Sequence, residues 1–199
     1  MGLRHSYTLL SPIYDFVVAG PTEKIRRDNL KKLDREKQTV LISGVGSGLD
    51  IPHLPGQHDY TGFDITPAML RKAEQRAKQY HLNIRLDRAD AMQLPYADNS
   101  FDIIIMHLIL AVVPHPERAL QEAQRVLKPG GSIHILDKFI HQGQLAPVRR
   151  LTNVFIRHIA TRTNVVFENL LNTCDELKLV DDKPVLLKGW FRSIDLEKR

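Results

Sequence analysis

The stretch VLISGVGSGLDIPHL, residues 40–54, places three glycines at alternate positions directly after an apolar run. That run, TVLIS at residues 39–43, is typical of a strand buried on both faces of a sheet. Gly44, Gly46 and Gly48 follow it, and glycines at the end of a strand let a ligand approach bare backbone. Because a glycine loop alone is a weak signal, the residues around it must decide what it binds.

Two kinds of nucleotide site compete for this loop. A dinucleotide fold requires G-x-G-x-x-G, with an acidic residue about 20 positions further along the chain. Here the third glycine comes one position early, and Leu49 stands where it should be. Pro52 and Pro55 also shorten the helix whose N-terminus would hold a diphosphate. Asp64 is at the distance expected of a ribose ligand, since an ionised carboxylate accepts both hydroxyl protons. The pattern favours an adenosine-like ligand without a diphosphate.

A second acidic residue follows the third predicted strand, NIRLDRAD at residues 83–90. Open α/β sheets bind ligands beyond the carboxyl ends of their strands, so Asp90 is expected beside the same ligand, facing an adenine amino group. Ala91 is small enough for its backbone N–H to meet a ring nitrogen, and Ile65 and Met92 are expected to enclose the base.

Strands alternate with helices through the middle of the chain, which predicts a parallel sheet with helices on both faces. The predicted strands are residues 39–43, 60–64, 83–90, 101–109 and 132–139. Predicted helices cover residues 22–34, the segment after Thr66-Pro67, with Thr66 as its cap, and residues 117–127. Two last strands, within residues 176–180 and 185–196, are expected to form an antiparallel edge.

Four motifs now carry a resemblance to a known family: VLISGVGSG, GFDITPAML, DAMQLPYADNSFD and RVLKPGG, in this order over residues 35–140. Together they resemble class I S-adenosylmethionine (SAM) methyltransferases. The resemblance implies a Rossmann-like α/β fold with a seven-stranded, mostly parallel sheet in the order 3-2-1-4-5-7-6. It also implies SAM as the cofactor, with the three glycines at its methionine part, Asp64 at the ribose, and Asp90 and Ala91 at the adenine.

One position departs from this family. Its members usually carry Asp or Glu near the end of the first strand, where this chain has Ile42. The expected consequence is the loss of one contact to the amino group of SAM, with the binding mode otherwise kept.

Shorter motifs resemble bacterial phospholipid N-methyltransferases that act on phosphatidylethanolamine, which are relatives of the quinone C-methyltransferases. They are SPIYDF, GVGSGLDIPHL, AVVPHPERAL, DKF and KGWFRSIDLEK. This resemblance implies one domain over residues 1–199, with a helical lid over residues 1–36 and a helical insertion over residues 140–175 that faces substrate or membrane. Tyr14, and also Tyr7, would belong to the lid and lie over the cofactor.

His107, at the end of the fourth predicted strand, is the candidate catalytic residue, because this fold usually meets its acceptor there. It could orient SAM or take a proton from an acceptor amine, and the alternative is simple packing at the sheet edge. Asp137 ends the fifth strand and could hold a cationic head group or cap a loop. The other histidines lack metal-ligand spacing, so no metal site is expected.

The chain carries a net charge of +5, which suits an anionic partner. One basic cluster comprises Lys24, Arg26, Arg27, Lys31 and Lys32. Residues 146–160, APVRRLTNVFIRHIA, combine an apolar helical stripe with arginines, the pattern of a helix lying on an anionic membrane surface, although the same stripe could pack as core.

A single cysteine, Cys174, together with the absence of a signal peptide or membrane span, predicts a cytoplasmic protein, peripheral on the inner membrane face. No nucleic-acid partner is expected, because no RNA-binding module and no N/D-P-P-Y loop is found. Three functions stay open: methylation of a phospholipid amine, methylation of another apolar acceptor such as a quinone, thiol or small amine, and SAM binding without turnover.

Overall fold

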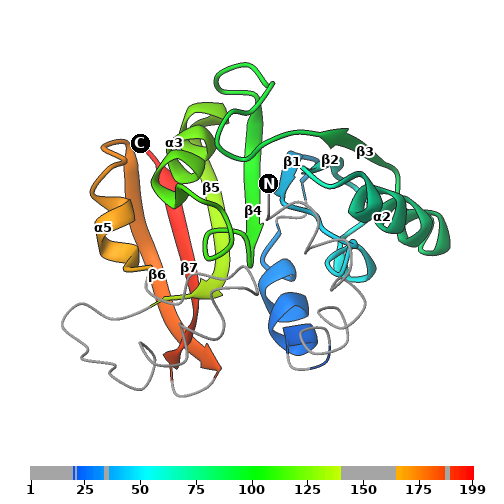
Figure 1. The fold of residues 1–199 in the computed structure, drawn as a ribbon, viewed down its shortest axis with the longest axis horizontal. Helices are drawn as coiled ribbons and strands as arrows, with labels where there is room; N and C mark the ends of the chain where they lie inside the picture. The colour runs from blue at the N-terminus through cyan, green and yellow to red at the C-terminus, as the bar shows by residue number, and fades with distance from the viewer. Residues whose placement is uncertain (1–19, 21, 34–35, 140–164, 187–188) are drawn as a thin grey trace.

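A seven-stranded sheet with the order β3-β2-β1-β4-β5-β7-β6 organises the molecule, as expected (Figure 1). The computed structural model describes residues 20, 22–33, 36–139, 165–186 and 189–199. The strands are β1 (Thr39–Ser43), β2 (Asp59–Asp64), β3 (Ile84–Arg88), β4 (Phe101–His107), β5 (Leu127–Lys138), β6 (Leu177–Leu186) and β7 (Phe191–Lys198). β7 runs antiparallel to both β5 and β6, and the other neighbours are parallel, so the predicted antiparallel edge is confirmed.

Helices cover both faces of this sheet, because alternate strand residues contribute to two separate apolar clusters. A helix over residues 22–30 and α2 (Pro67–Gln79) pack on one face, through Leu30, Ala73 and Ala77. The other face is covered by α3 (Pro116–Val126) and α5 (Phe167–Leu171). Figure 1 shows α2 beside β3 at one side of the molecule and α5 beside β6 at the other.

Some element ends differ from the prediction for local reasons. β4 stops at His107, two residues early, because Leu108 adopts a left-handed backbone with φ of 59° that no strand can continue. β5 begins at Leu127, directly after α3, and includes the KPGG segment before residue 132. An irregularity in the pairing with β4 between Phe101 and Ile103 absorbs these extra residues.

Several predictions fall on residues outside the described part of the chain. They are Tyr7, Tyr14, most of the lid over residues 1–36 and the basic stretch over residues 146–160. Of the insertion predicted over residues 140–175, the structure describes the part from Val165 onward, which contains α5. Across the described ranges, no helix has the length and apolar character needed to cross a bilayer.

Candidate active site

The predicted site residues meet at the carboxyl edge of the sheet. The glycine loop follows β1, Asp64 ends β2, Asp90 follows β3 and His107 ends β4. The parallel pairing of β1 with β2 and β4, and of β2 with β3, brings these strand ends together. Residues up to 63 positions apart in the sequence therefore share one edge of the sheet, where such folds bind ligands.

The three glycines are required for different reasons. All three have positive φ, at 67° for Gly44, 55° for Gly46 and 83° for Gly48. A Cβ on Gly44 would lie 2.5 Å from Cδ1 of Ile109, and one on Gly48 would lie 2.6 Å from Cδ1 of Ile51. Gly46 is different, because the nearest atom to its added Cβ is the Gly44 carbonyl oxygen at 3.9 Å. Gly46 thus presents open backbone, whereas the other two glycines are also required by the protein's own packing.

The carboxylate of Asp64 connects the glycine loop to the tip of β2. Its Oδ2 accepts a hydrogen bond from the Gly46 N–H at 3.1 Å, and its Oδ1 accepts one from the Thr66 N–H at 2.8 Å. Thr66 is the N-cap residue of α2 and Pro67 opens the helix, as predicted, although the Thr66 side chain makes no capping hydrogen bond. Burial raises the pKa of Asp64, partly offset by these hydrogen bonds. A carboxylate offers about four acceptor positions, so the carboxylate of Asp64 keeps acceptor capacity for a ribose hydroxyl.

The residues predicted to contact the adenine base differ in their solvent exposure in a way that suits this role. Ile65 is 41% exposed, which is unusual for a large apolar side chain and leaves it available to a ligand. Ala91 is buried, and Asp90 Oδ1 accepts a hydrogen bond from the Met92 N–H at 2.9 Å, which holds the turn after β3. An open glycine, a carboxylate with free lone pairs and an exposed apolar residue fit the loop, ribose and adenine contacts of SAM.

Ile42, which replaces the usual acidic residue of the first strand, is 1% exposed. It belongs to the apolar cluster on the α2 face, together with Ile51 and Ile105. An acidic side chain here would be buried in apolar surroundings, so this position offers no polar ligand to SAM.

A buried charged cluster lies at the end of β4 and consists of Arg26, Asp50 and His107, which we call the Asp50 cluster. Asp50 Oδ1 is 2.8 Å from both Arg26 Nη1 and His107 Nδ1. The three side chains are at most 7% exposed. Arg26 Nε also donates to Thr22 Oγ1 at 3.1 Å. The cluster joins the helix over residues 22–30, the glycine loop and the end of β4.

The sequence analysis found His107 but missed its two partners. Arg26 was assigned to a basic surface cluster, yet it is buried. Its spacing to Asn29, Leu30 and Leu33 places it on the buried face of the helix, and all four residues are buried. The helical periodicity of the sequence therefore already indicated that Arg26 is buried. Asp50, two residues after Gly48, had no local signal of a role.

The electrostatics of the cluster follow from its burial. Burial alone would raise the pKa of Asp50, but the positive charge of Arg26 and the hydrogen bonds from Arg26 and His107 outweigh it and hold this pKa well below its ordinary value. His107 Nε2, on the far side of the ring from Asp50, is buried without a hydrogen-bond partner in the described structure. A buried polar atom without a partner costs about 1–3 kcal/mol, so Nε2 is a candidate ligand-binding atom.

Asp137 is fully buried and makes the loop contact that was one of its two predicted roles. Its Oδ2 accepts from the Ala111 N–H at 3.1 Å, and its Oδ1 accepts from the Lys138 N–H at 2.7 Å. Burial raises its pKa to about 6, although these hydrogen bonds favour the charged form. The carboxylate thus holds the loop after β4 against the end of β5.

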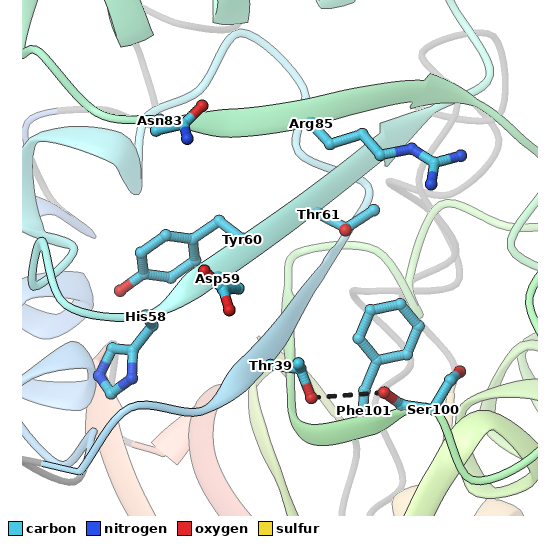
Figure 2. Close-up of a pocket in the computed structure, with 9 residues that line it drawn as sticks. All are labelled: Thr39, His58, Asp59, Tyr60, Thr61, Asn83, Arg85, Ser100 and Phe101. Carbon is cyan, nitrogen blue, oxygen red and sulfur yellow. Dashed lines mark hydrogen bonds between the residues drawn. The ribbon is translucent and has the colours of Figure 1, made fainter.

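A hollow of about 320 Å³ lies at the opposite, amino-terminal edge of the sheet (Figure 2). It is lined by residues at the starts of strands, such as Thr39, Asp59 and Phe101. The dashed line in Figure 2 marks the hydrogen bond from Thr39 Oγ1 to the Ser100 carbonyl oxygen, at 3.3 Å. None of the predicted site residues lines this hollow, so it is separate from the candidate active site.

Comparisons with known proteins identify the family of this chain. Residues 41–135 match the family described as a methyltransferase domain. A phosphatidylethanolamine N-methyltransferase of Cereibacter sphaeroides is 29% identical over 191 residues, covering 94% of this chain and 93% of that protein. A crystal structure titled a SAM-dependent methyltransferase, possible histamine N-methyltransferase, from Thermotoga maritima has a TM-score of 0.72 at 22% identity. It covers 98% of this chain and 99% of that one, and at this identity it shows the shared fold.

A demethylmenaquinone methyltransferase of Listeria welshimeri is 34% identical over 160 residues, which cover 75% of this chain and 67% of that enzyme. Similarity of this extent means that the chain belongs to the SAM-dependent methyltransferases and uses SAM as its cofactor.

Proposed function

We propose that this enzyme methylates the amine of a phospholipid head group, that of phosphatidylethanolamine and its partly methylated forms. The observation that carries the proposal is the extent of similarity to the Cereibacter sphaeroides protein, which covers 94% of this chain. That similarity extends well beyond the methyltransferase domain at residues 41–135. Because one fold serves many acceptors, similarity in the segments outside the shared domain is the stronger support for a particular acceptor.

The reaction requires the acceptor amine nitrogen to be neutral and close to the cofactor. SAM supplies a methyl group on a positively charged sulfur, and transfer to a neutral amine leaves a neutral thioether. An acceptor ammonium has no lone pair until it loses a proton. In the proposal His107 Nε2 takes that proton, the freed lone pair forms the new nitrogen–carbon bond, and the proton later passes to solvent. The rest of the acceleration comes from positioning in a site that excludes water.

A lipid acceptor also requires contact with a membrane, and the proposal assigns that contact to basic surfaces. In the helix over residues 22–30, Lys24 and Arg27 are exposed, whereas Arg26 is buried in the Asp50 cluster. Lys31 and Lys32 pair with Asp28 and Asp195, so the basic surface of this helix is smaller than the sequence indicated. The basic stretch over residues 146–160 supplies the remaining positive charge.

Vesicle sedimentation tests this contact. The protein is expected to pellet with vesicles containing phosphatidylglycerol and to be released by salt, because exposed charges are screened. The double variant Lys24→Gln/Arg27→Gln should release at lower salt than the parent. Equal pelleting with vesicles of neutral phosphatidylcholine would contradict an electrostatic attraction.

The relatives named demethylmenaquinone methyltransferases support a second candidate, a quinone acceptor. Carbon methylation of such a ring requires deprotonation of a hydroxyl instead of an ammonium. The same imidazole nitrogen could accept that proton, so the site chemistry alone fits both acceptors, and the wider similarity to the phospholipid enzyme favours the amine.

Incubation with methyl-labelled SAM separates the candidates. The enzyme is supplied in parallel with phosphatidylethanolamine vesicles, with demethylmenaquinone in the same vesicles, and with a total lipid extract, and the products are resolved by chromatography. Label in phosphatidyl-N-methylethanolamine is expected. Label only in the quinone would replace the first proposal with the second, and SAM binding without any transfer would contradict both.

A further inference from the structure

We propose that Arg26 and Asp50 are positioning residues that keep His107 neutral with its proton on Nδ1, so that Nε2 can accept a proton from the acceptor amine. The catalytic half of this inference rests on the proposed function. The state of the imidazole ring can be measured without any acceptor.

The proton position follows from the contact between Asp50 and His107. Asp50 Oδ1 lies 2.8 Å from His107 Nδ1, a full hydrogen bond. Since the Asp50 carboxylate is ionised, it can only accept, and Nδ1 must therefore be the donor. In a neutral imidazole the second nitrogen then carries the lone pair. That nitrogen, Nε2, is the buried atom without a partner in the described structure, so it is free to receive an N–H group.

The role of Arg26 follows from counting charges inside the cluster. A buried carboxylate facing an imidazole would by itself favour the charged imidazolium, whose Nε2 carries a proton and cannot accept another. Arg26 Nη1 lies 2.8 Å from the same oxygen of Asp50 and already balances its charge. With Arg26 in place, a neutral His107 leaves the cluster without net charge. Arg26 thus keeps the ring in the state that can take a proton.

The described structure contains a second cluster of a basic side chain, an aspartate and a histidine, which serves as an internal control. Asp195 pairs with Lys32 at 2.7 Å and with His134 Nδ1 at 2.8 Å. It joins residues after the same N-terminal helix to β5 and β7, as a structural clamp would. The Nε2 atom of His134 differs from that of His107, because it lies 3.5 Å from Ser132 Oγ. If the Asp50 cluster only held the N-terminal helix in place, substitutions in the two clusters should have similar effects on stability and on turnover.

Nitrogen-15 NMR of the histidine side chains is the decisive measurement, with the His107 signals assigned by their loss in His107→Gln. At pH about 7.5 the parent protein should show neutral His107 with the proton on Nδ1. Asp50→Asn replaces a group that can only accept by an amide whose N–H₂ can donate to Nδ1, so the Nδ1 proton is no longer enforced and the proton should move, wholly or in part, to Nε2. Arg26→Met should leave an Asp50–His107 ion pair with both nitrogens protonated, and Arg26→Lys should restore the neutral ring. Asp195→Asn should alter His134 and leave the His107 signals unchanged.

Turnover provides the second readout. Asp50→Asn should lower kcat on phosphatidylethanolamine by about 10²–10⁴-fold, the usual range for losing an oriented general base. Affinity for the demethylated cofactor, measured by calorimetry, should change less than about threefold if the pair acts on the proton acceptor. Asp195→Asn should lower the melting temperature while kcat stays within about threefold of the parent.

Two results would overturn the inference. One is an Asp50→Asn protein that keeps the Nδ1 proton or full turnover, and the other is an Arg26→Met protein whose His107 stays neutral. If Asp50→Asn fails to fold by circular dichroism, the comparison of Arg26→Met with Arg26→Lys decides the question. Phosphatidylethanolamine failing as an acceptor would remove the proposed function, while the ring signals would still test the positioning roles.

Discussion

The backbone N–H of Gly46 donates a 3.1 Å hydrogen bond to Oδ2 of Asp64, 18 residues further along the chain. One carboxylate therefore binds the loop glycine whose added Cβ would have the most room, and this carboxylate is the predicted ribose ligand of the cofactor. We therefore expect loop geometry and cofactor affinity to depend on the same side chain.

Replacing Asp64 by Ala should weaken binding of SAM and of its demethylated product by about 10–100-fold. The physical reason is the loss of hydrogen bonds to a charged acceptor, each worth about 1.5–3 kcal/mol, partly compensated by water. Isothermal calorimetry measures the effect. Asp59→Ala, at the exposed beginning of the same strand, is the matched control and should bind like the parent. Unchanged affinity in a folded Asp64→Ala protein would remove this residue from the site.

Alanine substitutions at Gly46 and Gly48 should separate ligand contact from packing. Both positions have positive φ, which costs an alanine about 1–2 kcal/mol. Gly48→Ala should lose a further 1–3 kcal/mol of stability, roughly, because its Cβ would crowd Ile51 and Ala73. Gly46→Ala should mainly reduce SAM affinity. Urea unfolding and calorimetry on both variants give the two quantities, and the opposite ranking in stability would contradict the assignment.

Asp137 should make stability fall as the pH rises. Its pKa in the folded protein is raised to about 6, from 3.8 in the unfolded chain, because it is buried. Its contribution is therefore fully present below pH 3.8 and declines until the pH passes 6. Relative to Asp137→Asn, the parent should lose up to about 3 kcal/mol of unfolding free energy across this interval. Urea titrations at pH 4, 5, 6 and 7 measure the difference, and parallel profiles for the two proteins would refute it.

Arg192 should be required for the packing of α5 on the sheet. Its guanidinium pairs with Asp182 and with Glu168, and it lies 5.4 Å from the centre of the Phe167 ring. Arg192→Met would leave two partly exposed carboxylates without a cation, which should cost about 1–3 kcal/mol. The double variant Arg192→Met/Asp182→Asn should recover part of that loss. Arg85→Met, which breaks an ion pair with Asp87 at the surface, should cost less than about 1 kcal/mol.

Much of the fold could be predicted from local patterns. The alternation of strands and helices and the placement of Asp64 and Asp90 after their strands depend on residues close in sequence. Parallel strands then bring their carboxyl ends to one edge without further information. Element ends were less predictable, because the left-handed Leu108 and the pairing irregularity before Ile103 arise from contacts with β5.

The sequence by itself was sufficient to predict the glycine loop and the acidic residues at the strand ends that suit SAM. Through its family resemblance it also predicted the order of the strands in the sheet. Tertiary structure alone decided that Arg26 is buried, that Asp50 joins it to His107, and that Gly46 differs from its two neighbours in presenting open backbone. The physical reason is that burial and charge pairing depend on the surroundings of a side chain. Those surroundings are supplied here by segments up to 81 residues apart, which no local periodicity can relate.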